Sequence, residues 1–249
     1  MNEPAARLES IDGYPLPLRK VAAEGRLTGL VFDLSITQTW ENDSATNIEG
    51  VFTFPVPHHA VLLGLELQIG DRHLEACAVA RGKAAKEYEE AIDEGNTAVL
   101  LEHSDDGIYT VSLGNLQAGE HAVIRYRYAQ LLDRTGDAVR LSVPTVIAPR
   151  YGDAGRAGLA PHAVPTTDLS VAYPFELKIL IVGDLANSNF ESPTHPVNVK
   201  RGSQSTDVIL KPGAWLDRDF VLLVSGAETA ATSTLYRDGD EWVALLSMD

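Results

Sequence analysis

The sequence contains one cysteine, Cys77, among 249 residues. A single cysteine excludes an internal disulfide, on which small secreted domains usually depend. No stretch approaches the roughly 18 consecutive apolar residues of a membrane helix. The first seven residues lack the basic start and apolar segment of a signal peptide. These absences favour a cytoplasmic location, with a periplasmic or surface-anchored one as the alternative.

Positive charge is also scarce. The chain has 20 Lys and Arg against 35 Asp and Glu, a formal net charge of −15. Proteins that bind nucleic acid or anionic membranes use clustered basic residues to neutralise phosphates, so this balance argues against both kinds of partner. Hydrophobic residues make up 45% of the chain, which is ordinary for a globular protein. We therefore expect protein partners, no nucleic acid and no membrane insertion.

Patterns that carry catalysis are missing as well. The sequence has no Gly-x-Ser-x-Gly elbow, no phosphate-binding loop and no zinc-ligand spacing among its seven histidines. His58 and His59 are adjacent, so in an extended segment their side chains diverge. Cys77 lies between alanines, which is typical of a small buried side chain. The sequence predicts no enzyme activity, no cofactor and no metal site.

Alternation of apolar and polar residues is the dominant signal, and it predicts β-strands. Leu30, Phe32, Leu34, Ile36 and Trp40 share one face, and Asp33, Ser35 and Thr37 share the other. These three match an Asp-x-Ser-x-Thr metal motif, but in the middle of an amphipathic strand they are better interpreted as a solvated face. Residues 48–54 resume the alternation, and we interpret the two strands as a hairpin.

A second hairpin is predicted over residues 61–80. Val61, Leu63, Leu65, Leu67 and Ile69 alternate on one face, and a turn at Gly70 precedes a return strand over 73–80. Further strands are predicted over 97–101, 108–113, 121–131, 139–143, 175–182, 197–200, 207–210 and 219–225. Trp40, Tyr88, Tyr126 and Tyr128 lie in line with apolar rows, which predicts core positions.

One segment, residues 83–93, has helical periodicity, and Gly95 is placed to end the helix. Glu89, Glu90 and Asp93 lie outside its apolar stripe. The simplest interpretation is a solvated helix face; the functional one is a docking surface for a basic partner. These three residues are the candidate interaction surface.

Several short motifs in fixed order resemble the VIT domain, the vault-protein and inter-α-trypsin type of domain, over residues 8–150. They are Pro15–Leu18, Thr37–Asn42, Val51–Pro57, Ile69–Asp71, Lys83–Tyr88 and Ser112–Glu120. The resemblance implies a β-sandwich with one helix and a scaffold or recognition role. VIT domains are often followed by a von Willebrand A domain, and residues 217–222 look like the connection toward one in bacterial relatives.

The sequence therefore predicts an all-β fold: an antiparallel β-sandwich with one short α-helix over residues 8–150, then a second, smaller β-sandwich. Residues 151–168 are predicted to be a linker, 169–225 the second β-domain, and 226–249 a flexible segment with a final hairpin that leads toward a downstream domain. The expected function is a non-enzymatic interaction module. The alternative is a carbohydrate-binding or hydrolytic β-sandwich. Exposure of the aromatic residues Trp40, Trp215 and Trp242 would favour sugar binding, and a flat polar or acidic face would favour protein docking.

Overall fold

The computed structural model describes residues 8–10, 18–75, 90, 99–104, 107–145, 174–215, 217–226, 232–238 and 241–247. Nearly all of these residues are in β-strands, which confirms the predicted fold class. The predicted linker, Cys77, Tyr88 and most of the predicted helix lie outside the described residues. Glu90 is helical. One further helical segment, the 3-10 helix η2, spans Asp184–Asn187.

The largest element is an eight-stranded sheet. In spatial order its strands are β14 (Val197–Arg201), β15 (Ser205–Leu210), β12 (Phe175–Val182), β2 (Leu18–Thr28), β3 (Val31–Glu41), β9 (His121–Leu131), β5 (Ala60–Ile69) and β6 (Arg72–Glu75). All neighbours in it are antiparallel except β2 and β12, which run parallel. The sheet is therefore mixed, where the sequence predicted antiparallel pairing throughout.

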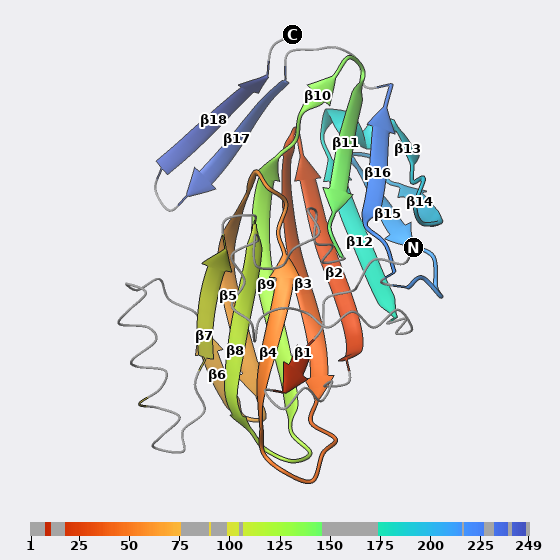
Figure 1. The fold of residues 1–249 in the computed structure, drawn as a ribbon. Helices are drawn as coiled ribbons and strands as arrows, with labels where there is room; N and C mark the ends of the chain where they lie inside the picture. The colour runs from red at the N-terminus through yellow and green to blue at the C-terminus, as the bar shows by residue number, and fades with distance from the viewer. Residues whose placement is uncertain are drawn as a thin grey trace.

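Two four-stranded antiparallel sheets cover one face of the large sheet, as Figure 1 shows. The first consists of β1 (Leu8–Ser10), β4 (Ile48–Pro55), β8 (Ile108–Leu116) and β7 (Val99–Ser104). The second consists of β10 (Arg134–Thr135), β11 (Ala138–Val143), β16 (Phe220–Ser225) and β13 (Asn189–Glu191). A separate hairpin joins β17 (Thr232–Asp238) to β18 (Glu241–Ser247).

Strands from the two predicted sandwich regions share these sheets. β12 pairs with β2 along eight residues, from Phe175 opposite Val21 to Val182 opposite Thr28. β11 pairs with β16 along six residues. Their buried side chains form one core cluster. The strands over 175–225 therefore extend the first sandwich, because β12 and β16 supply the hydrogen-bonded neighbours along one edge each of β2 and β11.

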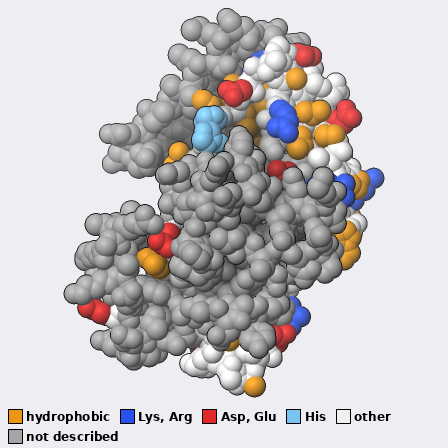
Figure 2. Space-filling model, in the orientation of Figure 1, with side chains coloured by type: hydrophobic (Ala, Val, Ile, Leu, Met, Phe, Trp, Pro, Cys, Tyr) orange, Lys and Arg blue, Asp and Glu red, His pale blue; other side chains and the backbone are white. Residues whose placement is uncertain are grey.

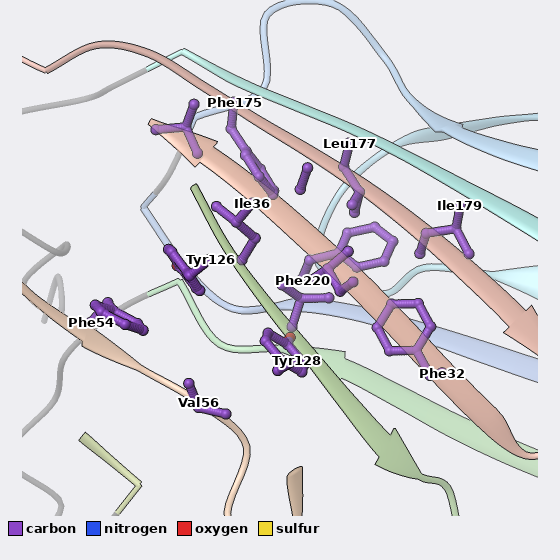
Figure 3. Close-up of a cluster of buried hydrophobic side chains, with 14 of the residues drawn as sticks. Phe32, Ile36, Phe54, Val56, Tyr126, Tyr128, Phe175, Leu177, Ile179 and Phe220 are labelled. Atoms are coloured by element: carbon purple, nitrogen blue, oxygen red, sulfur yellow. The ribbon is translucent and has the colours of Figure 1, made fainter. Parts of the chain in front are cut away.

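Aromatic side chains fill the space between the layers, and Figure 3 shows several of them meeting there. The ring of Phe54 from β4 stacks on Tyr126 from β9, with ring centroids 4.1 Å apart. Trp40, Tyr126 and Tyr128 are buried, which confirms the core positions predicted for them. Burial raises the pKa of Tyr128 well above its usual range. These rings tie the four-stranded sheets to the large one.

The predicted hairpin between residues 30–40 and 48–54 is wrong. β3 lies in the large sheet, whereas β4 pairs with β1 and β8 in the opposite layer. The loop after β3 carries the chain from one layer to the other. Asn42 holds this loop in place, because its side-chain Nδ2 donates to the carbonyl oxygens of Thr46, Leu116 and Gln117 at 2.9–3.1 Å.

The predicted single apolar row in β5 is also wrong in its first half. Leu65, Leu67 and Ile69 are buried, but Val61 and Leu63 are 63% and 51% exposed. The register against β9 shifts between Leu62 and Gly64, which marks a β-bulge. One extra residue reverses the alternation, so Val61 lies on the outer face.

Candidate interaction surfaces

The predicted surface at Glu89, Glu90 and Asp93 is described at one residue. Glu90 is helical and exposed, while Glu89 and Asp93 lie outside the described residues. The structure therefore places one of the three carboxylates at the surface and does not test whether the three share a face. The surface stays a prediction.

The outer face of the eight-stranded sheet is the broadest surface that the sequence did not single out. Alternate residues of β2, β3, β9, β12 and β15 are buried, and those between them are exposed or half-buried. Charged side chains on this outer face pair across neighbouring strands: Lys20 with Glu176 at 2.9 Å, Asp33 with Arg127 at 2.9 Å, Glu66 with Arg125 at 3.0 Å, and Lys178 with Asp207 at 3.3 Å.

Asp33 and Thr37, two of the three residues of the apparent metal motif, both accept hydrogen bonds from arginine side chains on β9. Both oxygens of the Asp33 carboxylate accept from the Arg127 guanidinium, and the Thr37 hydroxyl accepts from Arg125 Nε at 3.4 Å. The hydrogen bonds to Asp33 raise the pKa of Arg127. The predicted solvated strand face is confirmed. Within the described ranges, no group of three or more His, Cys, Asp or Glu side chains is arranged to hold a metal ion.

The opposite side of the molecule is mixed in character. In Figure 2 the described side chains over β11 and β16 include hydrophobic, basic and acidic groups lying among one another.

The three tryptophans bear on the alternative of sugar binding. Trp40 is buried and Trp215 is 46% exposed, while the side chain of Trp242 lies outside the described residues. Trp215 is the only large aromatic side chain exposed in the described part of the chain. Nothing there favours a flat aromatic platform for sugar.

Asn42, 1% exposed, organises one end of the sandwich. Its side-chain oxygen accepts from the Ser44 hydroxyl at 2.7 Å, and its backbone nitrogen donates to the Glu120 carbonyl oxygen at 2.9 Å. The Glu120 carboxylate in turn accepts two hydrogen bonds from Arg72 Nη2, at 2.7 and 2.9 Å. The family-like motifs around residues 37–42, 69–71 and 112–120 therefore meet at this end and serve to hold its loops together.

A buried histidine lies near the start of β14. The ring nitrogens of His195 contact the Thr194 hydroxyl at 3.0 Å and the Trp215 carbonyl oxygen at 3.4 Å. Burial lowers the pKa of His195, and the hydrogen bond from Arg218 lowers the pKa of the nearby Asp217. Because both ring nitrogens are occupied by local partners, this arrangement is suited to holding loops, and sequence periodicity gave no signal for it.

Comparison with known proteins supports an interaction domain. The family model of the Vault protein inter-alpha-trypsin domain (VIT) matches residues 18–128. Von Willebrand factor A domain-containing protein 5A of Homo sapiens is 27% identical over an alignment of 238 residues, and the alignment covers 90% of this chain and 30% of that protein. Protein mono-ADP-ribosyltransferase PARP4 of Mus musculus is 29% identical over 148 residues, 59% of this chain and 8% of that protein.

The chain spans less than a third of the length of these relatives. The match to protein 5A extends well beyond residue 128, in agreement with the sheets that β12 and β16 share with the earlier strands. Among solved structures, aminopeptidase A of Legionella pneumophila in complex with aspartic acid has a TM-score of 0.42 at 11% identity, covering 96% of this chain and 25% of that one. A likeness this low carries no argument. In the described ranges no helix is long and apolar enough to cross a membrane.

Proposed function

Because residues 18–128 match the family model of the VIT domain, we propose that the chain is a non-enzymatic protein-interaction module. In a longer protein it would position a von Willebrand A-type domain and contact further proteins. The matched family and the names of the relatives support an interaction module. The placement of a von Willebrand A-type domain after this chain is proposed in addition to that interaction role.

The observation that carries the proposal is the large sheet with one covered face. Its inner side chains are buried beneath the two four-stranded sheets. Its outer face presents charged side chains from six neighbouring strands, β15, β12, β2, β3, β9 and β5. A broad, ordered, polar face on a rigid scaffold suits recognition of another protein, because little conformational entropy is lost on binding.

We assign the acidic side chains of Glu89, Glu90 and Asp93 to contact with a basic partner. The net charge of −15 supports this choice, since it attracts basic proteins over distances near the Debye length. Glu90 is exposed, as the assignment requires.

Affinity capture from lysate of the source organism tests the proposal. The immobilised chain is compared with the triple variant E89K/E90K/D93K and with a control variant, D71K/D133K/D137K, which changes the net charge equally at exposed turns. We expect proteins that the wild type and the control retain and the first variant loses. Retention of no protein above background by the wild type would contradict the interaction module. Equal retention by all three would contradict the acidic surface alone.

A further inference from the structure

The strand β14 ends the large sheet, and within the described residues β15 is its only hydrogen-bonded neighbour. Figure 1 shows it at the margin of the sheet, beyond β15. Four of its five residues are exposed, and the fifth, Val197, packs in part against the core. An ordered edge strand of this kind carries a row of unpaired backbone groups.

The ladder between β14 and β15 fixes which backbone groups face the open side. Gly202 N donates to Ser205 O at 2.7 Å at one end, and Lys211 N donates to Pro196 O at 3.0 Å at the other. In an antiparallel pair, hydrogen-bonded residues alternate with residues whose backbone groups point away. With these ends as reference, Asn198 and Lys200 bond to β15.

The alternate residues, Val197, Val199 and Arg201, therefore direct their N–H and C=O groups to the open side. Successive outward residues are about 6.6 Å apart along the strand, and the hydrogen-bonding groups of an added strand repeat at the same distance. The register is regular over all five residues, so no bulge twists this edge away.

Side chains of the same residues hold the edge in place. The Arg201 guanidinium donates to the carbonyl oxygens of Ala186 at 3.2 Å and Ser188 at 2.7 Å. It also lies 5.5 Å from the ring centre of Phe190. Val199 lies opposite the buried Val208 and is itself 38% exposed, which leaves an apolar contact at the rim. The edge is thus formed before any partner arrives, which lowers the cost of ordering on binding.

The stretch of sequence that contains β14 is opposite in charge to the whole chain. Between His195 and Trp215 there are three basic residues, Lys200, Arg201 and Lys211, and one acidic residue, Asp207. The Asp207 carboxylate is already paired with Lys178. An acidic segment therefore finds complementary charge here, although the chain carries a net charge of −15.

We propose that β14 binds an extended acidic segment of a partner protein by strand addition. The backbone groups of Val197, Val199 and Arg201 supply the ladder, Val199 contacts an apolar side chain, and Lys200 pairs with a carboxylate. This assignment rests on the proposed interaction function and names a second contact surface, separate from the acidic one. A second copy of the chain is disfavoured, because two chains of charge −15 repel and their edge lysines lie close together.

The variant V199P tests the edge selectively. The N–H that proline removes points to the open side, so the ladder to β15 stays complete, and proline is tolerated on edge strands. N198A is the matched control, since it keeps every outward group. The probe is a short fluorescent peptide of alternating glutamate and valine, with an alternating lysine and valine peptide for comparison, and binding is followed by anisotropy.

We expect saturable binding of the glutamate peptide, weaker by about tenfold or more in V199P and unchanged in N198A. K200E should also weaken binding of the glutamate peptide. Wild-type binding no tighter than that of the lysine peptide, or equal binding by V199P, overturns the proposal. A concentration-dependent dimer that V199P abolishes overturns it in favour of a second copy.

Hydrogen exchange gives a readout that needs no variant. In the free protein the amides of Asn198 and Lys200 should exchange slowly and that of Val199 fast, and the glutamate peptide should slow Val199. No change at Val199 overturns the proposal. Capture of lysate proteins by a wild-type chain that fails to bind the glutamate peptide would leave the interaction module standing and contradict the edge contact alone. Weaker peptide binding by V199P supports the edge contact only if V199P melts at the wild-type temperature.

Discussion

Phe54 and Tyr126 stack across the two layers of the sandwich, with ring centroids 4.1 Å apart. Phe54 comes from β4 of a four-stranded sheet and Tyr126 from β9 near the middle of the large one. Phe54 also stacks on Tyr109 of β8 at 5.6 Å. The family-like segment around residues 51–57 thus contributes a side chain that joins the layers.

Replacing this ring tests how much the joint contributes. F54A should lower the free energy of unfolding by about 3–5 kcal/mol, because a fully buried ring leaves a cavity between two rigid sheets. Urea denaturation measures the change. F54L should cost clearly less, and a loss below about 1 kcal/mol in F54A would contradict the packing.

Asn42 should matter through its hydrogen bonds. N42A leaves the carbonyl oxygens of Leu116 and Gln117 without this donor and should cost about 3 kcal/mol. The neighbouring D43A is the control. Asp43 is exposed and lies 3.9 Å from Arg19, so its removal should cost less than about 0.5 kcal/mol. Similar losses in the two variants, measured by urea denaturation, would show that Asn42 has no special role.

The outer ion pairs should contribute little to stability. In a double-mutant cycle of D33N and R127Q, the coupling free energy should be below about 1 kcal/mol, because the pair is exposed to solvent and screened by salt. A coupling of several kcal/mol would show that this face is not a free solvated surface, and would weaken its assignment to recognition.

The pH dependence of stability should carry the signature of His195. Burial lowers its folded-state pKa below the unfolded value of about 6.5, so the unfolded chain binds the proton first as the pH falls. The free energy of unfolding should therefore decline as pH falls from about 7.5 to 5.5. Asp217, whose pKa is lowered, stays ionised there, and Arg218 stays charged.

The matched variant for this measurement is H195N, which removes the titrating group. Denaturation at the two pH values should show a smaller decline in the variant than in the wild type. An equal decline in both proteins would assign the pH dependence to other groups.

The shared sheets predict that the early strands do not fold alone. A chain ending at residue 145 loses β12 and β16, which uncovers the edges of β2 and β11. It should lack the cooperative thermal transition of a chain ending at residue 226. A sharp transition in the shorter chain would instead support the division into two β-domains predicted from the sequence.

Alternation located many strands well because their inner faces are buried and their outer faces polar. Residues 121–131 and 175–182 were predicted with the bounds that the structure gives. β2, a central strand, was missed. Its inner row contains Ala23 and Gly25, and Gly25 is small because a Cβ atom there would lie 2.7 Å from the Phe32 ring. Small residues chosen for close packing weaken the hydrophobic signal.

The pairing of strands that lie far apart in the sequence could not be predicted, for a different reason. A parallel partner such as β12 for β2 lies more than 140 residues away along the chain, and alternation says which face is buried without saying which strand lies beside it. The bulge at Leu63 has only one local signature, the glycine that follows it at position 64. The binding edge of β14 could be identified only from the hydrogen-bonded ladder to β15, because the register of that ladder determines which backbone groups, among them those of Val199, point outward.

The most direct test of the interaction module is a calorimetric titration of the purified chain with the protein that it captures most reproducibly, also purified. The account predicts saturable binding that E89K/E90K/D93K weakens and that D71K/D133K/D137K leaves unchanged. Failure of the purified proteins to bind each other would contradict the central claim that this chain recognises a protein partner directly.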